Sequence, residues 1–192
     1  IPFGDVIHLP VGRLAVSCYA MEESGDSAYV FFSEDDGRSW GGARLIGADE
    51  YNETDLLYLG DGKILAASRS RRGGETWLFT SADEGQTWSN NGPVTLPLEM
   101  PAHLAKLRDG SVLLTYGVRH RGLLGVCARL SSDDGATWDA PRVLFNTTVK
   151  IANTSPAGTD GGYPSSVQLD DGTIVTAYYC QRLPDHQRYH MG

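Results

Sequence analysis

The sequence predicts an all-β fold of repeated four-stranded antiparallel sheets, the arrangement found in the blades of a β-propeller. Three observations predict it. An eight-residue motif occurs three times at nearly constant spacing, glycine turns recur in step with it, and no stretch has the period of a long amphipathic helix. A repeat of about 40 to 50 residues with four short strands is one propeller blade.

The repeated motif reads S-x-D-x-G-x-[ST]-W and begins at Ser33, Ser81 and Ser131. Successive copies start 48 residues apart (33 to 81) and 50 residues apart (81 to 131). In each copy the aspartate and the first serine can bond the backbone of a tight turn, while the tryptophan covers the sheet. We therefore interpret the motif as a structural turn and not as a catalytic element.

Glycine turns mark a hairpin in each repeat. Gly12, Gly62, Gly110 and Gly172 each lie between two strand-like runs, and three of the four are preceded by aspartate. Asp-Gly between such runs is typical of a tight hairpin, because glycine adopts a positive φ at little cost. Each turn therefore joins two strands, A and B.

The Asp-containing motif is expected to join strands C and D. The predicted C strands are 29–32, 77–80 and 125–130, and the predicted D strands are 43–46, 94–96 and 142–145. We expect one partial propeller domain over 1–192, with three to four blades. The repeats fall at approximately 1–50, 51–100, 101–150 and 151–192, the last incomplete.

Composition narrows the function. The chain is 41% hydrophobic, enough for a core, and its net charge of -8 argues against nucleic acid as a partner, because phosphate backbones are bound by clustered lysine and arginine. No run approaches the roughly 20 apolar residues that span a bilayer. The three cysteines show neither zinc-site spacing nor a disulfide framework, and nothing in the sequence supports a bound metal or cofactor.

The motif resembles the Asp-box, or bacterial neuraminidase (BNR), repeat of the sialidase superfamily, and the resemblance covers nearly all of the chain. It implies a β-propeller of sialidase type, which has six blades in that family. Because a partial ring leaves strand edges open, we expect missing sequence or another chain to supply the remainder. The resemblance also implies a carbohydrate partner and a secreted or periplasmic location.

Strand direction places several polar residues at one end of the repeats. Strand A runs toward its turn, B runs back and C runs forward to the motif, so the starts of A and the ends of B share the opposite end. Glu53 and Tyr163 each lie nine residues before their turn glycines, 62 and 172. Arg69 ends a B strand, and His103 begins the A strand of the repeat between them.

The loop after the third B strand adds Arg119, His120 and Arg121 to the same end, whereas Arg129 falls at the opposite end of strand C. A solvated rim also carries polar residues without function, and a histidine such as His103 is more often structural. A carboxylate beside a phenol can nevertheless take its proton during nucleophilic attack.

The resemblance implies a role for most of these residues. Tyr163 resembles the nucleophile, Glu53 its base, and Arg69 a member of the carboxylate clamp. Arg119 is preferred to Arg121 as a second clamp arginine. The first clamp arginine of the family, in an Arg-Ile-Pro-like segment, and its acid/base aspartate are expected in early blades that this chain lacks.

These observations favour part of a sialidase-like exo-glycosidase that acts on a terminal sialic-acid-like or other acidic sugar through a tyrosine nucleophile. His103 and Arg121 are further candidates for binding the substrate. Two alternatives stay open: a non-catalytic carbohydrate-binding propeller, and a uronate lyase in which His103 and Tyr163 act as base and acid while arginine neutralises the uronate.

Overall fold

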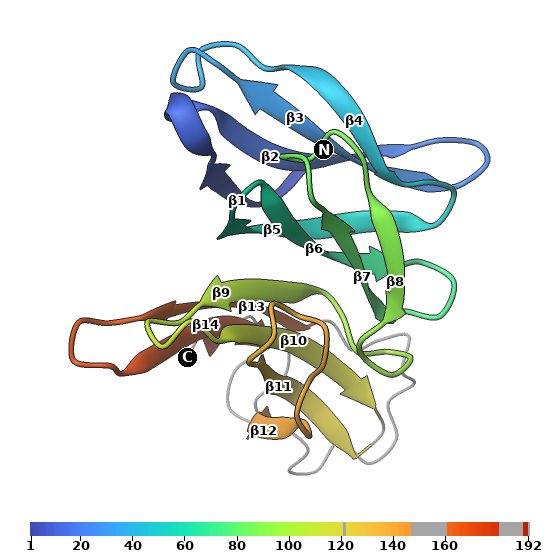
Figure 1. Ribbon diagram of the computed structural model, residues 1–192. Coiled ribbons are helices and arrows are strands. Elements are labelled where there is room, and N and C mark those ends of the chain that lie inside the picture. The colour runs from blue at the N-terminus through green and yellow to red at the C-terminus, as the bar shows by residue number, and fades with distance from the viewer. Residues whose placement is uncertain (121, 147–160, 181–189, 192) are drawn as a thin grey trace. The chain divides into compact units, whose positions relative to one another are not determined.

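A computed structural model describes residues 1–120, 122–146, 161–180 and 190–191, and its strands form four antiparallel sheets (Figure 1). A three-residue 3-10 turn, Pro10–Gly12, joins β1 to β2. The strands are β1 (Pro2–His8), β2 (Leu14–Met21), β3 (Asp26–Ser33), β4 (Gly41–Gly47), β5 (Tyr51–Gly60), β6 (Lys63–Ser70), β7 (Thr76–Ser81), β8 (Ser89–Pro93), β9 (Ala102–Lys106), β10 (Val112–His120), β11 (Leu123–Ser131), β12 (Arg142–Asn146), β13 (Gly161–Gln168), β14 (Ile174–Cys180) and β15 (His190–Met191).

The sheets follow one another along the chain. Sheet 1 is β1-β2-β3-β4, sheet 2 is β5-β6-β7-β8, sheet 3 is β9-β10-β11-β12 and sheet 4 is β13-β14-β15. Each strand pairs antiparallel with the next, as a propeller blade requires. Sheets 1 and 2 form one compact unit, 1–96, and sheets 3 and 4 form another, 97–192. The predicted all-β class is confirmed, and the described part holds no helix long and apolar enough to cross a membrane.

The predicted hairpin and C strands are confirmed. Asp61 and Gly62 have φ values of 50° and 77°, the doubly left-handed turn that suits the twist of paired strands. Strands β3, β7 and β11 cover the three predicted C segments.

One predicted D strand is wrong. We expected residues 94–96, but β8 is Ser89–Pro93 and begins directly after Trp88. Its register runs from Ser89 opposite Thr80 to Pro93 opposite Trp77, and Val94 N adds one bond to the Thr76 carbonyl oxygen at the start of β7. The strand is polar because it is largely exposed, whereas Val94 is buried behind its end.

All three Asp boxes have the same hydrogen bonds. In the second box the Ser81 hydroxyl donates to Asp83 Oδ1 at 2.8 Å and accepts from Gly85 N, while Asp83 accepts from both the backbone N and the hydroxyl of Thr87. Trp88 Nε1 donates to the Gly85 carbonyl oxygen. These bonds satisfy the turn internally, so the structural interpretation of the motif is confirmed.

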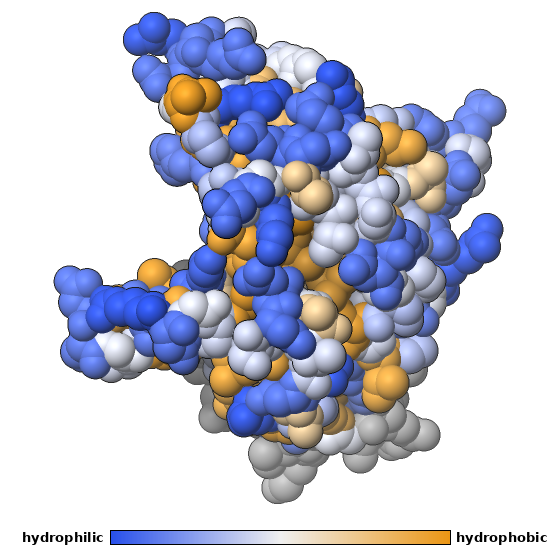
Figure 2. All heavy atoms as spheres, in the orientation of Figure 1, coloured by the Kyte–Doolittle hydropathy of each residue, from blue (hydrophilic) through white to orange (hydrophobic). Residues whose placement is uncertain are grey.

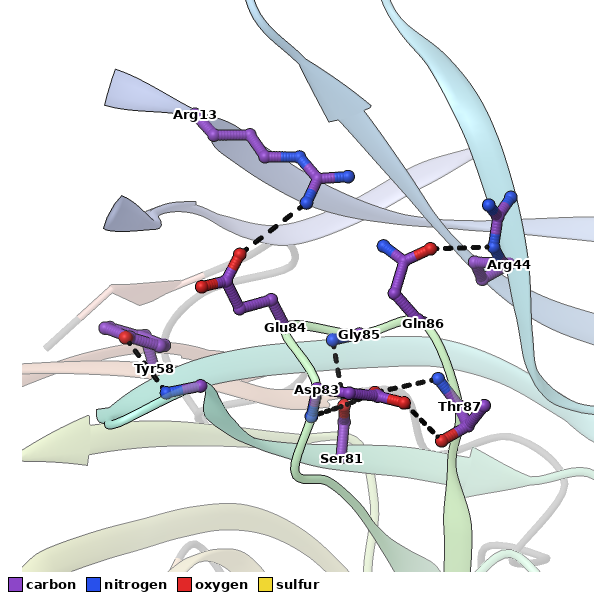
Figure 3. A network of polar contacts seen from close by, with 10 residues as sticks. Arg13, Arg44, Tyr58, Ser81, Asp83, Glu84, Gly85, Gln86 and Thr87 are labelled. Atoms are coloured by element: carbon purple, nitrogen blue, oxygen red, sulfur yellow. Dashed lines mark hydrogen bonds and ion pairs between the residues drawn. The ribbon is translucent and has the colours of Figure 1, made fainter. Parts of the chain in front are cut away.

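The second box also ties sheet 2 to sheet 1 (Figure 3). Glu84 lies 3.7 Å from the guanidinium of Arg13, and Gln86 accepts a hydrogen bond of 3.1 Å from Arg44 Nε. Glu84 N also donates to the carbonyl oxygen of Gly62. The A–B turn and the Asp box of sheet 2 therefore lie at one end, as strand direction predicts.

The core of the first unit lies between the facing sides of sheets 1 and 2. The side chains buried there are Ile7, Ala15, Val30, Phe32, Leu56, Ile64, Ala66 and Phe79. In the second unit the largest buried side chains come from β10, among them Val112, Leu114 and Tyr116. In the space-filling view, hydrophilic residues cover much of the visible face and hydrophobic residues reach the surface in smaller patches (Figure 2).

Candidate active site

The candidate residues of the first unit include an ion pair between Glu53, near the start of β5, and Arg69, near the end of β6. Arg69 Nη1 donates to Glu53 Oε2 at 2.7 Å. The two side chains are 24% (Arg69) and 12% (Glu53) exposed, so water screens the pair less than it screens a surface pair. The structure brings these two residues together at the end of sheet 2 away from its Asp box.

A β-bulge sets the direction of Glu53. Tyr51 pairs with Ser70 and Thr54 pairs with Ser68, so three steps along β5 match two along β6. The extra residue falls at 52–53 and interrupts the ladder there. Bulges of this kind redirect a side chain out of the regular alternation of a strand.

The bulge is held by a buried carboxylate from sheet 1. Asp26, at the start of β3, is 2% exposed and accepts from Asn52 Nδ2 at 2.9 Å and from Arg71 Nη1 at 3.0 Å. Asn52 is itself buried, and its Oδ1 has no hydrogen-bond partner among the described residues. A buried polar atom in that state costs about 1–3 kcal/mol.

Tyr19 of β2 lies beside the same group. Ser17 donates its hydroxyl hydrogen to the Thr54 carbonyl oxygen, and Tyr19 is two residues further along the same face of β2. Burial raises the pKa of Tyr19, and the negative charges of Glu53 and Asp26 raise it further. The phenol therefore stays protonated and available as a hydrogen-bond donor.

The candidate residues of the second unit surround Tyr163 in sheet 4. Gly162 pairs with Tyr179 and Ser165 pairs with Ala177, so β13 also carries a bulge, which contains Tyr163. Tyr163 has φ 47°, a left-handed conformation that is uncommon for an aromatic residue. Its ring stacks on Tyr179 with centroids 5.3 Å apart. Non-glycine strain of this kind accumulates at functional positions.

Arg119, at the end of β10, is held against the start of β13. Its Nε and Nη2 donate to the Gly161 carbonyl oxygen at 3.3 and 3.2 Å, and its guanidinium carbon lies 5.8 Å from the Tyr163 ring centroid. The backbones meet closely here, because a Cβ on Gly162 would lie 2.7 Å from Gly117 Cα. The contact with β10 therefore requires glycine at position 162, directly before Tyr163.

The structure places His103 in the interior of the second unit. It lies on β9, is 7% exposed, and its Nδ1 accepts from the backbone N–H of Ser166 at 3.3 Å. Ser166 bonds Thr115 and Thr176 in turn. His103 thus takes part in packing β9 against β13.

The other residues of the predicted loop have separate positions. His120 Nε2 lies 3.1 Å from Oε1 of Glu99, a carboxylate that is mostly buried. Arg121 lies outside the described residues. Arg129 bonds the carbonyl oxygens of Trp138 and Asp139 next to the third Asp box, as its exclusion by strand direction predicts.

Sequence reasoning missed Tyr19, Asp26 and Arg71. None of them belongs to a repeated motif, but strand direction alone places Asp26, at the beginning of a C strand, at the same end as Glu53. Across the ranges that the structure describes, no three His, Cys, Asp or Glu side chains gather to hold a metal ion. The functional groups among these residues are phenols, carboxylates and guanidinium groups. Such groups can transfer protons and bind an anion.

Comparison with known proteins shows the family and supports the propeller fold. The sequence matches the family described as BNR repeat-like domain over residues 4–176. A protein of unknown function from Dyadobacter fermentans is 27% identical and superposes with a TM-score of 0.79 over 98% of this chain and 51% of that chain. A search of curated proteins found no match.

Two further solved structures share the fold. The Hadza microbial sialidase Hz136 is 20% identical, with a TM-score of 0.65 over 91% of this chain and 34% of its own. The α-L-arabinanase of Penicillium chrysogenum, solved with arabinobiose, is 18% identical, with a TM-score of 0.69 over 99% of this chain and 60% of its own. The chain thus spans about half of the Dyadobacter protein and a third of the sialidase.

Proposed function

The chain belongs to the family of BNR repeat-like domains, and from that premise we propose that it forms part of a retaining exo-glycosidase for a terminal acidic sugar, with Tyr163 as nucleophile and Glu53 as its base. Successive blades of a propeller present equivalent strand ends to one rim. Glu53 and Tyr163 occupy equivalent strand positions, nine residues before their turn glycines.

The observation that carries this proposal is the shared bulge. In both hairpins the register near the turn is the same, with Tyr58 opposite Ile64 in one and Gln168 opposite Ile174 in the other. In both, the bulge contains the residue nine before the turn glycine. In both strands the ladder is interrupted at this position, which holds a carboxylate in β5 and a phenol in β13. Such bulges are frequent next to active sites.

In the proposed reaction the phenol oxygen of Tyr163 attacks the anomeric carbon while Glu53 accepts the phenolic proton. The bond to the leaving oxygen breaks with its electron pair, that oxygen takes a proton from the acid/base group expected in the remainder of the propeller, and a covalent glycosyl-tyrosine forms. Water then attacks the anomeric carbon and gives a proton to the same acid/base group, while the phenol oxygen leaves and regains its proton from Glu53. A neutral phenol suits an anionic sugar because a carboxylate nucleophile would be repelled.

Arginines supply the binding energy in this scheme. Arg69 is oriented by Glu53 and Arg119 by the Gly161 carbonyl oxygen, and both would bind the sugar carboxylate. Planar guanidinium groups fit the two oxygens of a carboxylate better than an ammonium does. Arg119 also lies near the Tyr163 ring, where its charge favours negative charge developing on the phenol oxygen.

The proposed substrate is a sialic-acid-like or other acidic sugar at the end of a glycan, and a secreted or periplasmic location would expose the protein to it. His103 is proposed to act through position, because its Nδ1 is engaged with Ser166 inside the unit. This geometry favours the glycosidase over a lyase with His103 as base.

The test is turnover of aryl glycosides of acidic sugars by the intact protein and its Tyr163→Phe variant. We expect loss of at least roughly 100-fold in kcat, because the nucleophilic oxygen is removed. Tyr58→Phe is the matched control, since Tyr58 bonds Gly62 N at the Asp-box end, and it should keep wild-type turnover.

Three results would contradict the proposal in different ways. Equal turnover by Tyr163→Phe would exclude the nucleophile. An unsaturated product absorbing in the ultraviolet would indicate a uronate lyase. Glycan binding that is lost in Arg69→Ala, without hydrolysis of any glycoside, would indicate a non-catalytic binding propeller.

A further inference from the structure

Asp26 is a buried acid that bonds residues next to the Glu53–Arg69 pair, and the proposed reaction does not use it. Its two oxygens bond two segments of sheet 2. Oδ2 accepts from Asn52 of β5, the residue before Glu53, and Oδ1 accepts from Arg71 in the turn directly after β6, two residues after Arg69. One carboxylate from sheet 1 thus holds the start of β5 and the chain that follows β6, on both sides of the pair.

We propose that Asp26 is a positioning residue that fixes the geometry of the Glu53–Arg69 pair. The bulge in β5 has lost regular ladder pairing, so side chains must define its conformation. Asn52 is held from two directions, by Asp26 through its side chain and by the Thr54 hydroxyl, which donates to its carbonyl oxygen. The direction of Glu53 follows from how Asn52 is held.

The bond from Arg71 to Asp26 fixes the chain that follows β6. Arg71 N donates to the Glu50 carbonyl oxygen at 2.7 Å, and Arg71 Nη1 donates to Asp26. The Arg71 side chain is 57% exposed and that of Asp26 only 3%, so the anchor is the buried carboxylate and the arginine extends from it toward solvent. Loss of Asp26 would free the chain on both sides of the pair.

Burial makes Asp26 suited to this role. A carboxylate removed from water keeps its charge only when partners satisfy it, and here two charged or polar donors do so. Because one donor lies on β5 and the other directly after β6, the bonds also constrain how these two segments lie relative to each other. Networks of this kind fix a single arrangement of the groups that they connect.

The test compares Asp26→Asn with wild type in the intact protein. An asparagine replaces one acceptor oxygen by a donor, so it cannot accept from Asn52 and Arg71 through two separate oxygens as Asp26 does. Crystal structures should show Glu53 and Arg69 no longer within hydrogen-bond distance. The catalytic readout rests on the proposed function: kcat for an aryl glycoside should fall roughly 10- to 100-fold, because small misplacement of a reacting group has effects of that size. The rise in KM should be smaller.

Two further variants separate positioning from general damage. Arg71→Lys keeps a positive donor for Asp26 and should retain most of the activity, whereas Arg71→Met should lose part of it. Asp170→Asn is the matched control, because Asp170 also pairs with an arginine, Arg108, at 2.9 Å, but is fully exposed at a hairpin turn. It should leave kcat and the Glu53–Arg69 distance unchanged.

The possible results distinguish failure of the positioning role of Asp26 from failure of the proposed function. Wild-type pair geometry and wild-type kcat in Asp26→Asn would overturn the positioning role. A wild-type protein that neither hydrolyses nor binds acidic glycans would overturn the proposed function, and the crystal structures would still decide the role of Asp26. If Asp26→Asn does not fold, Arg71→Met and Asn52→Ala each break one of the two bonds. An unchanged pair distance in both would overturn the inference.

Discussion

Arg119 and Tyr163 come from neighbouring sheets of the second unit, and the guanidinium carbon lies 5.8 Å from the ring centroid of the tyrosine. Two bonds from Arg119 to the Gly161 carbonyl oxygen hold the cation at this place. The arginine is therefore oriented by the segment that leads into Tyr163, and the position of the phenol and of the positive charge depend on each other.

This dependence predicts that Arg119→Lys is not a conservative change. Lysine keeps the charge but cannot donate through two nitrogens to one carbonyl oxygen while presenting a planar face to the ring. We expect kcat/KM for an aryl glycoside of an acidic sugar to fall roughly 10- to 100-fold, equivalent to about 1.4–2.7 kcal/mol.

The matched control for that variant is Arg108→Lys. Arg108 also donates to backbone carbonyl oxygens, those of Leu169 and Asp170, but it lies exposed at a turn. A similar loss of kcat/KM in both variants would show that the effect comes from stability and not from the site.

The close approach of β10 and β13 predicts different costs for two glycines of nearly equal conformation. Gly162 and Gly172 have φ of 95° and 92°, so alanine is strained at both, by about 1–2 kcal/mol. At Gly172 a Cβ meets nothing within 4 Å, whereas at Gly162 it lies 2.7 Å from Gly117 Cα. Gly162→Ala should cost ~1–3 kcal/mol more in urea unfolding of the intact protein. Equal costs would mean that the approach carries no constraint.

The repeat and its turns could be predicted because they depend on local chemistry. The hydrogen bonds of the motif lie within its own eight residues, and the Asp-Gly turn needs only residues that tolerate a positive φ. Both can therefore be recognised from a few consecutive residues. The β8 strand could not be located from its residues, since Ser89–Pro93 is polar and exposed and is defined by pairing with β7. The prediction followed the apolar residues 94–96 instead.

Only some of the candidate site residues could be placed from the sequence, because the others depend on contacts between sheets. That Glu53 and Arg69 share one end of their hairpin could be predicted by counting from a turn glycine, because strand direction fixes that end. Asp26 and Arg71 meet through contact between two sheets, and no spacing along the chain encodes that contact. The bulges of β5 and β13 depend on register, which the partner strand decides.

The contact between sheets 1 and 2 predicts a structural role for Ser17. This residue is 1% exposed, and its hydroxyl lies within bonding distance of two carbonyl oxygens, those of Phe3 and Thr54. Ser17→Ala leaves these buried acceptors without that donor, and we expect a loss of about 1–3 kcal/mol in the free energy of unfolding. Ser165→Ala, at an exposed position of β13, should change it by less than about 0.5 kcal/mol. Equal effects would show that the hydroxyl of Ser17 is dispensable.

The Asp boxes predict how stability depends on pH. The pKa of Asp83 is lowered to about 2, chiefly by the hydrogen bond from the Thr87 hydroxyl and then by those from the Thr87 backbone and Ser81. The pKa of Asp133 is also lowered to about 2, chiefly by the hydroxyl of Thr137. Because the folded pKa lies below the unfolded value near 3.9, the boxes stabilise the fold above about pH 4 and lose that contribution as the pH falls toward 2.

Asp83→Asn should therefore lower the Tm of the intact protein at pH 6 and much less at pH 2.5, where the wild-type carboxylate is itself partly protonated. Asp36→Asn, at a variable position of the first box, is the control and should leave the difference between the two pH values as in wild type. A Tm loss in Asp83→Asn of the same size at both pH values would show that the charge of the carboxylate, as opposed to the shape of the side chain, does not stabilise the turn.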